Sequence, residues 1–261
     1  MTITMPPIDK VLLGTAGVVG TSVLAWRTLF PWIGDDIKFL RKSKEARAIT
    51  DKHVTDGKMI VDLFEEDVLR TPKQPVIIFE DRSYTYELVN EQANRVASLA
   101  SQWGLKVGDT VAIMIGNEPA FIWTYIGLQK LGIAVAYINY NIKRKALVHS
   151  LKSCDAKVLI IGKDEEIFHT VDEIRNESSE TPVYVQGRDI KHSGDYFPWD
   201  DLLLVALPVQ VAKSAREGVT YETTSCFIFT SGTTGRDEVN QYVCYFFRQR
   251  YRRLPYLYSS I

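Results

Sequence analysis

The sequence predicts an α/β protein built around a parallel β-sheet. Short apolar runs of strand type begin at residues 110, 133, 157 and 182, with helical patterns between them. This alternation is typical of βαβ units, whose right-handed crossovers place helices on both faces of the sheet. A further strand, Cys226–Phe229, leads straight into a run of glycine and hydroxyl residues, Thr230–Gly235. Open α/β sheets bind ligands at this edge, outside the carboxyl ends of their strands.

The composition is that of an ordinary globular protein with no sign of a nucleic-acid partner. The chain has 261 residues, of which 46% are apolar and 24% charged, with a net charge of −1. No basic stripe with interleaved aromatics precedes residue 236. The three cysteines, at 154, 226 and 244, form no CxxC pair, which fits a reducing compartment. The histidines at 53, 149, 169 and 192 lack metal-ligand spacing, so we predict no metal site and expect surface or packing roles.

The amino terminus predicts a membrane-associated segment over residues 1–34. An uncharged stretch, Val11–Trp26, is interrupted by Arg27 and continues to Ile33, which is marginal against the ~20 apolar residues of a spanning helix. The strongly basic Lys38–Arg47 follows and places the downstream chain in the cytosol by the positive-inside rule. We expect an uncleaved anchor or hairpin, single-pass or membrane-associated, at the endoplasmic reticulum or plasma membrane. A cleaved signal peptide and a buried soluble helix stay open as alternatives.

Downstream of this segment the elements follow one another with clear boundaries. Residues 35–57 predict a basic linker or short helix, and Met59–Leu69 predicts a helix. Val76–Phe79 and Ser83–Tyr86 predict a hairpin. Thr85 is the expected N-cap of a helix that runs to Trp103 and closes at Gly104.

The later elements alternate strand and helix. Asn117 is the expected N-cap of the first helix of this series, with Pro119 in its first turn. The predicted strands are Thr110–Ile115, Ile133–Ile138, Lys157–Ile161, Pro182–Gln186 and 226–229, and the predicted helices run from Asn117 to Leu131, Lys143 to Cys154, Glu165 to Ile174 and Asp200 to Leu207, with a connection over 208–224.

The run Thr230–Gly235 has the chemistry of a loop that wraps phosphate. Glycines allow a close backbone approach and positive φ, while hydroxyl and backbone N–H groups donate to phosphate oxygens. An ordinary surface turn is the plain alternative, but the strand before the run and the βαβ units behind it favour a phosphate loop. A Walker-type loop is disfavoured because no lysine follows Gly235.

Three groups of residues carry a resemblance to the acyl-adenylating, AMP-binding superfamily. They are Ser83–Leu88, Asn94–Ala97 and Gly104–Ala112, together with the Thr230–Gly235 core. Three further segments, Gly116–Phe121, Gly127–Gly132 and Ala136–Ile142, resemble one branch, the fatty acid transport proteins or very long-chain acyl-CoA synthetases. The resemblance covers residues 58–235 and implies a partial AMP-binding domain. It implies an AMP-forming ligase that converts fatty acid, ATP and CoA, with Mg²⁺, to acyl-CoA, AMP and pyrophosphate.

By motif match, the phosphate loop would be formed by Thr230, Ser231, Gly232, Thr233, Thr234 and Gly235. The family's proline and lysine would fall at Asp237 and Glu238, where a carboxylate repels ATP. We therefore expect a truncated, catalytically incomplete form, in which the catalytic residues stay unknown. The alternative is a non-enzymatic isoform that binds a membrane or a full-length family member.

The carboxy-terminal tail, two acidic runs and one aromatic cluster are not assigned a role in the chemistry. The divergent tail 236–261 is basic and aromatic, with seven aromatics and five arginines, and an alternative exon or frame shift is weighed against an interaction element. Glu65–Asp67 and Asp164–Glu166 are expected on solvated faces, and the Phe121, Trp123 and Tyr125 cluster in the core. Because later family segments complete the sheets, 208–261 is expected to be poorly ordered.

Overall fold

The computed structural model describes residues 30, 32–142, 144–178, 180–187, 196–229 and 239–243. The chain divides into two units, Met1–Gly57 and Lys58–Ile261. Apart from its last positions, the predicted membrane segment at 11–33 lies outside the described residues, and within them no helix is long and apolar enough to cross a bilayer.

The described part of the first unit is essentially one helix, α2 (Ile33–Thr55), where the sequence predicts a linker or short helix. Asp35 and Asp36 occupy its first turn, and Lys52 and His53 its last. Negative charge at the amino end and positive charge at the carboxyl end of a helix both interact favourably with the helix macrodipole. No residue of α2 is buried, so its stability does not come from packing of an apolar face.

The second unit begins with the predicted helix and hairpin. Helix α3 (Ile60–Arg70) is followed by the antiparallel strands β1 (Pro75–Phe79) and β2 (Arg82–Thr85). The Thr85 hydroxyl accepts a hydrogen bond from the Leu88 N–H at 3.3 Å, which confirms Thr85 as the N-cap of α4 (Tyr86–Ala100). A short 3₁₀ turn, η1 (Ser101–Trp103), carries the chain to Gly104, whose φ of 68° ends the helical run.

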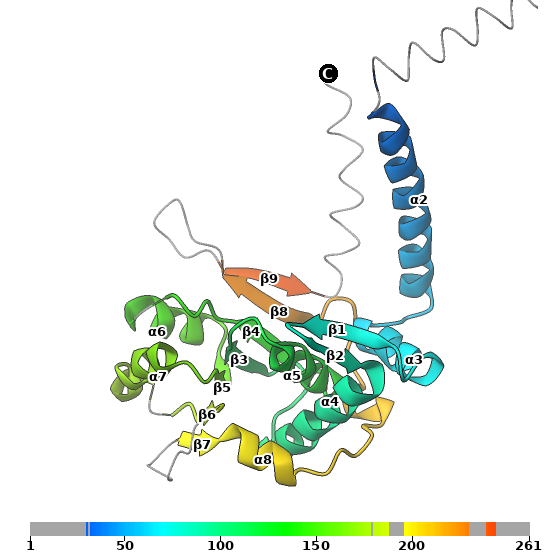
Figure 1. Cartoon of the computed structure of the whole chain (residues 1–261). Helices are drawn as coiled ribbons and strands as arrows, with labels where there is room; N and C mark the ends of the chain where they lie inside the picture. Colours follow the sequence, from blue (N-terminus) through cyan, green and yellow to red (C-terminus); the bar gives the residue numbers. More distant parts are fainter. Residues whose placement is uncertain are drawn as a thin grey trace, which may run out of the picture. The chain divides into compact units, whose positions relative to one another are not determined.

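Within the described residues, the main sheet has seven strands in the order β7-β6-β5-β3-β4-β8-β9 (Figure 1). All neighbours are parallel except β9, which pairs antiparallel with β8. The predicted parallel sheet is therefore confirmed. The strands are β3 (Thr110–Met114), β4 (Ala134–Tyr137), β5 (Ala156–Ile161), β6 (Val183–Val185), β7 (Tyr196–Pro198), β8 (Thr224–Phe229) and β9 (Val239–Val243).

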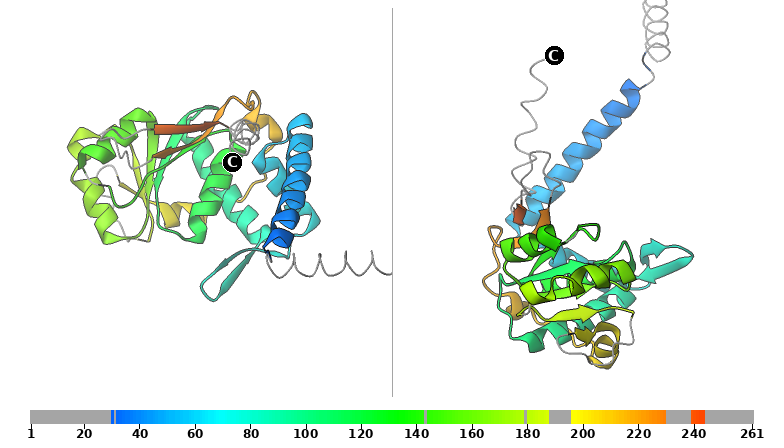
Figure 2. Two further views of the ribbon diagram at one scale, coloured as in Figure 1. Left: turned by 90° about the horizontal axis from the view of Figure 1, so that it is seen from above. Right: turned by 90° about the vertical axis from the view of Figure 1, so that its left-hand side faces the viewer.

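Helices cover both faces of this sheet, as right-handed crossovers require (Figures 1 and 2). On one face, α6 (Arg144–Ser153) and α7 (Glu165–Asp172) pack on the side chains of Ala112 and Met114. On the other, α4, α5 (Pro119–Lys130) and α8 (Trp199–Val205) pack on Val111 and Ile113. Successive side chains of β3 point to opposite faces of the sheet, so Val111 and Ile113 contact one layer of helices and Ala112 and Met114 contact the other.

The packing of α4 on α5 explains one glycine of the chain. A Cβ at Gly127 would lie 2.5 Å from the Ala93 carbonyl oxygen and 2.7 Å from the Val96 Cβ. Real Cβ contacts are not that short, so only glycine allows the two helices to approach this closely.

Several predicted details are wrong. Glu118, not Asn117, is the N-cap of α5, and Pro119 stands at its first position. The helix from Glu165 ends at Asp172 and gives way to the 3₁₀ turn η2 (Arg175–Glu177). The expected disorder of 208–261 does not hold for 208–229, which forms a connection, the 3₁₀ turn η3 (Lys213–Arg216) and β8. The sequence did not predict β7 or β9, which are short edge elements.

Candidate functional site

The candidate site lies at the carboxyl edge of the parallel sheet. Strands β3, β4, β5 and β8 all end there, because parallel strands share one direction. The register pairs Tyr137 of β4 with Ile228 of β8. The chain therefore leaves β8 beside the exposed residues Asn139 and Tyr140, which follow β4. The predicted phosphate-loop residues, Thr230, Ser231, Gly232, Thr233, Thr234 and Gly235, come directly after β8 and lie outside the described residues.

Side chains of α5 hold the strand that leads to this loop. The Ser225 hydroxyl donates to Gln129 Oε1 at 3.0 Å, and Gln129 Nε2 donates to the Ser225 carbonyl at 3.1 Å. Tyr125 Oη and Ser225 Oγ are 3.2 Å apart. These contacts fix the beginning of β8 against α5.

The predicted aromatic cluster of α5 also contacts β4, the strand beside β8. Phe121 stacks on Tyr137 with ring centroids 4.9 Å apart, and Tyr125 lies 6.1 Å from the same ring. Burial raises the pKa of Tyr137 far above its ordinary value, so this hydroxyl stays protonated. Phe121, Trp123 and Tyr125 pack against the apolar core, which confirms the expected core role.

The loops after β3 and β5 close against each other at the same edge. Gly162 donates its N–H to the Met114 carbonyl, and a Cβ there would lie 3.4 Å from the Ile115 Cα. Lys163 pairs with the mostly buried Glu118 at 3.5 Å. The helices that follow β3 and β5 lie on opposite faces of the sheet, which is where a ligand crevice usually opens. Here glycine packing and an ion pair occupy that position, so the exit of β4 and β8 is the better candidate for a ligand.

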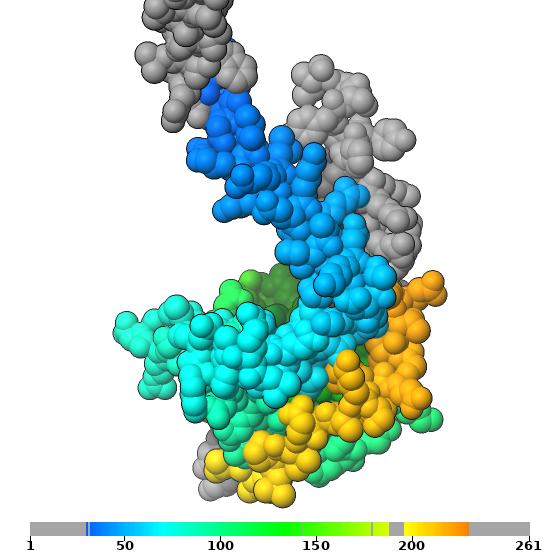
Figure 3. Space-filling model, turned by 90° about the vertical axis from the view of Figure 1, so that its right-hand side faces the viewer, coloured from blue at the N-terminus to red at the C-terminus, as the bar shows by residue number. Residues whose placement is uncertain are grey.

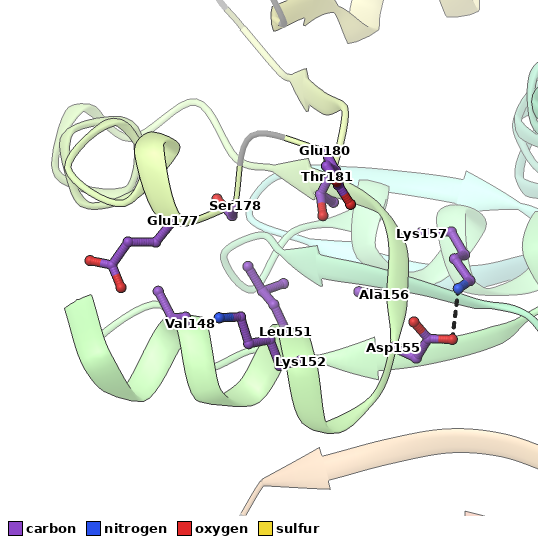
Figure 4. A pocket seen from close by; sticks show the side chains of 10 residues that line it. All are labelled: Val148, Leu151, Lys152, Asp155, Ala156, Lys157, Glu177, Ser178, Glu180 and Thr181. Atoms are coloured by element: carbon purple, nitrogen blue, oxygen red, sulfur yellow. Dashed lines mark hydrogen bonds and ion pairs between the residues drawn. The ribbon is translucent and has the colours of Figure 1, made fainter.

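A cavity of about 440 Å³ lies at the opposite, amino end of the sheet (Figure 4). Helix α6, the start of β5 and the segment after η2 line it, and Lys157 pairs with Asp155 at 2.7 Å on its rim. A second cavity, about 220 Å³, lies between α4, α5 and α8. Neither cavity includes the ends of β4 or β8, so neither adds to the candidate site.

A buried group of charges that joins α3, α5 and η3 was not predicted from the sequence. Arg216 Nη2 lies 2.7 Å from Asp62 Oδ1 and 2.9 Å from Glu65 Oε2, and both Asp62 and Arg216 have side chains only 6% exposed. Lys130 is fully buried and lies 3.0 Å from Glu65 Oε1. The expectation that Glu65 lies on a solvated face is therefore wrong, whereas its neighbours Glu66 and Asp67 pair with Lys58 and Arg70 at the surface.

Each charged side chain in this group has at least one hydrogen-bond partner, although Arg216 Nη1 is buried with none among the described residues. The Lys130 ammonium donates to Asn90 Oδ1 at 2.7 Å and Asn94 Oδ1 at 2.8 Å, so with Glu65 it has one acceptor for each of its three protons. Burial lowers the pKa of Lys130. Burial would raise the pKa of Asp62, but hydrogen bonds from Lys213, Arg216 and the Met59 N–H outweigh it and lower that pKa. Lys130, a charged residue at the end of the mostly apolar α5, was the available signal for this group.

Figure 3 shows the surface above these charges, where α3 in cyan meets the yellow and orange segment that leads from α8 through η3. Gln210, in this segment, donates to Glu65 at 3.2 Å and accepts from Asn94 at 3.2 Å. The charges therefore tie the chain just before β8 to the start of the unit.

The chain is similar in sequence and in structure to known proteins. The model of the family described as AMP-binding enzyme matches residues 64–237. Long-chain fatty acid transport protein 2 of Rattus norvegicus is 34% identical over 210 residues, which are 78% of this chain and 33% of that protein. Long-chain fatty acid transport protein 6 of Homo sapiens is 33% identical over 80% of this chain and 34% of its own length. The chain thus spans about a third of the length of these curated relatives.

A ligase and two solved structures extend the comparison. Medium/long-chain-fatty-acid--CoA ligase FadD6 of Mycobacterium tuberculosis is 30% identical over 66% of this chain and 27% of its own. The anthranilate CoA ligase AuaEII in complex with anthranoyl-AMP superposes with a TM-score of 0.64 at 22% identity, over 72% of this chain and 35% of that chain. The inhibitor-bound N-terminal domain of FACL13 from Mycobacterium tuberculosis superposes with a TM-score of 0.60 at 22% identity, over 72% of this chain and 44% of that chain. These structures share the fold.

Proposed function

Because the chain belongs to the family of AMP-binding enzymes, we propose that it carries the nucleotide-binding part of a long-chain or very long-chain fatty acyl-CoA ligase. The fatty acid carboxylate attacks the α-phosphate of ATP and releases pyrophosphate, and the CoA thiol then displaces AMP from the acyl-adenylate. The names of the relatives, fatty acid transport proteins and a fatty-acid–CoA ligase, support this substrate class.

The observation that carries the proposal is the position of β8. This strand stands beside β4 in the parallel sheet, is held by Tyr125 and Gln129, and leads into Thr230–Gly235. In the proposal, the hydroxyl and backbone N–H groups of Thr230, Ser231, Gly232, Thr233, Thr234 and Gly235 bind the ATP phosphates. Such donors stabilise the charge that develops on the phosphate during adenylate formation.

A role for Mg²⁺ is implied only by the family resemblance, according to which the ion neutralises the charge of the ATP phosphates. Within the described parts of the chain, no three His, Cys, Asp or Glu residues gather as a metal site. At the carboxyl edge Glu118 is already paired with Lys163. We therefore assign no protein ligand to the ion.

We further propose that the polypeptide 1–261 does not form acyl-CoA on its own. The support is that Asp237 and Glu238, two and three residues after Gly235, place two carboxylates where the resemblance expects a proline and a lysine. The purified chain with ATP, Mg²⁺, CoA and a long-chain fatty acid should release no pyrophosphate above background. Turnover that Gly232→Asp abolishes would overturn this proposal.

Nucleotide binding tests the loop separately from turnover. Calorimetry with ATP and with a non-hydrolysable acyl-adenylate analogue compares the wild-type chain with Asp237→Pro/Glu238→Lys. We expect the double variant to bind about tenfold more tightly or better, since an ammonium attracts the phosphates that a carboxylate repels. Gly232→Asp should abolish the gain, and Asn176→Asp, which adds one charge on the exposed η2 turn, should not.

The same measurement decides between the enzyme and the non-enzymatic alternative. The alternative, a module that binds a membrane or a full-length relative, is favoured by the carboxylates at 237 and 238. If neither the wild-type chain nor the double variant binds either nucleotide, this chain does not use the loop for ATP.

The membrane association of residues 11–33 and the cytosolic position of the α/β unit remain proposals. The uncharged run Val11–Trp26 and the basic stretch after it support them. Extraction of membranes with alkaline carbonate should leave the chain in the pellet. Complete release would remove the anchor, and glycosylation at Asn176 would reverse the orientation.

A further inference from the structure

The cavity of about 220 Å³ between α4, α5 and α8 combines apolar walls with two unpaired polar groups. Trp123 of α5 and Leu203 and Leu204 of α8 supply apolar surface. Trp199, the first residue of α8, and Gln186, which follows β6, also line the cavity. Both Trp199 Nε1 and Gln186 Oε1 are buried, and neither atom has a hydrogen-bond partner among the described residues.

The two unpaired atoms are of opposite kinds. The indole Nε1 of Trp199 can only donate, and the amide Oε1 of Gln186 can only accept. Trp199 is fully buried, and its ring centroid lies 6.3 Å from that of Trp103 and 5.9 Å from that of Tyr184. Buried polar groups nearly always have partners, and one without a partner lowers stability. An unpaired donor and an unpaired acceptor around one cavity therefore favour a ligand that supplies both complements.

Hydrogen bonds hold the walls of this cavity in place. Arg95 Nη1 donates to three carbonyl oxygens at the end of α8, at 3.4, 3.2 and 2.7 Å, and so fixes that end to α4. Asp200 Oδ2 accepts a hydrogen bond from the Gly187 N–H, which fixes the start of α8 beside Gln186. The cavity is therefore preformed, as sites for small molecules usually are.

The charges on the walls favour an uncharged ligand. Arg95 already pairs with Glu91 at 3.0 Å and with the carbonyls of α8, and its guanidinium would repel a cation. Asp200 is an exposed carboxylate that also lines the cavity, and it would repel an anion. A neutral molecule with an apolar body avoids both costs.

We propose that this cavity binds a small uncharged amide with an apolar body. The carbonyl of the amide accepts from Trp199 Nε1, its N–H donates to Gln186 Oε1, and its apolar part packs on Trp123 and Leu203. The cavity does not include the ends of β4 or β8. This site is therefore separate from the proposed phosphate loop, and its test does not depend on nucleotide binding.

Calorimetric titration of the full chain with benzamide tests the proposal. We expect saturable binding with a Kd of about 1 mM or lower, which a molecule of this size can reach. Acetophenone keeps the carbonyl but lacks the N–H, and benzoate is an anion, so both should bind at least about tenfold more weakly. No saturation by about 10 mM benzamide, or equal binding of acetophenone, would overturn the proposal.

Two variants assign the polar contacts. Trp199→Phe removes the donor but keeps an aromatic ring, and it should weaken benzamide binding by about tenfold. Gln186→Met removes the acceptor at similar size and should bring the affinity for benzamide down to that for acetophenone. The control Trp103→Phe removes an indole N–H from a neighbouring ring that does not line the cavity, and it should leave binding unchanged. Equal losses in Trp103→Phe and Trp199→Phe would contradict the assignment.

The indole N–H signals in the NMR spectrum of the isotope-labelled chain give a readout that misfolding does not imitate. The chain has five tryptophans, and the signal missing from Trp199→Phe identifies that of Trp199. Benzamide should shift this signal downfield, as a new hydrogen bond does, and by more than the signal of Trp103. A shift confined to other tryptophans would place the ligand elsewhere and refute the site.

Discussion

The charges shared by α3, α5 and η3 and those around the amino ends of β5 and β6 are alike in residue type but not in surroundings. The first group, Asp62, Glu65, Lys130 and Arg216, is largely or wholly removed from solvent. The second includes Lys152, Asp155, Lys157, Glu177 and Glu180, all exposed around an open cavity (Figure 4).

This difference decides what each group does for the protein. A buried charge that loses its partner keeps its desolvation cost, whereas an exposed one regains water. The buried group of Asp62, Glu65, Lys130 and Arg216 therefore holds together elements that are distant in sequence. The exposed charges around the cavity remain solvated and are expected to contribute little to stability. The buried group matters for the candidate site because Arg216 lies shortly before β8, which leads to the predicted phosphate loop.

The largest effect is expected at Arg216. Arg216→Ala leaves Asp62 and Glu65 without their shared guanidinium and should lower the free energy of unfolding by about 3–5 kcal/mol. The control is Lys213→Ala, which removes a mostly exposed partner of the same Asp62 and should cost about 1 kcal/mol or less. Urea denaturation measures both. Equal costs would break the contrast between buried and exposed partners.

Lys130 should show the next largest effect. Lys130→Met keeps most of the side-chain volume but leaves Asn90, Asn94 and Glu65 without the ammonium they share. We expect a loss of about 2–3 kcal/mol in unfolding free energy, because Asn90 and Asn94 lose this donor and Glu65 keeps only Arg216 and Gln210. A neutral or stabilising result would mean that the group is satisfied without Lys130 and that its burial is not costly.

The acid limb of the stability curve should depend on Asp62. Its pKa is lowered in the folded state, so its contribution is complete above the ordinary carboxyl pKa of about 4 and is lost as the pH falls through the folded value. Asp62→Asn should be less stable at neutral pH and should lose less stability on acidification. Denaturation at a series of pH values measures this, with Asp81→Asn at an exposed position as control. Parallel curves for the wild-type chain and Asp62→Asn would contradict it.

The smallest effect is expected on the exposed rim. Lys157→Ala breaks the 2.7 Å pair with Asp155, but both side chains are open to water. We expect no resolvable change in the melting midpoint, measured beside Arg216→Ala under the same conditions. A shift comparable to that of the buried variants would remove the distinction between the two groups.

Most of the regular elements could be predicted from the sequence alone. Strands β3, β4, β5, β6 and β8 and the helices between them follow from local periodicity, because a side chain that alternates or recurs every three to four residues can be assigned without knowing its partner. Thr85 as a cap and the position of Thr230–Gly235 after a strand are local features of the same kind.

Only the tertiary structure decided the rest. The partners of Arg216 lie 151 and 154 residues away in the sequence, and no local pattern marks Glu65 as mostly buried while Glu66 beside it is exposed. The edge strands β7 and β9 are defined by the neighbours they pair with, and the Ser225, Gln129 and Tyr125 contacts form only when β8 reaches α5. Local periodicity is set by backbone geometry within one element, whereas the pairing of buried charges is set by which distant elements the chain brings together.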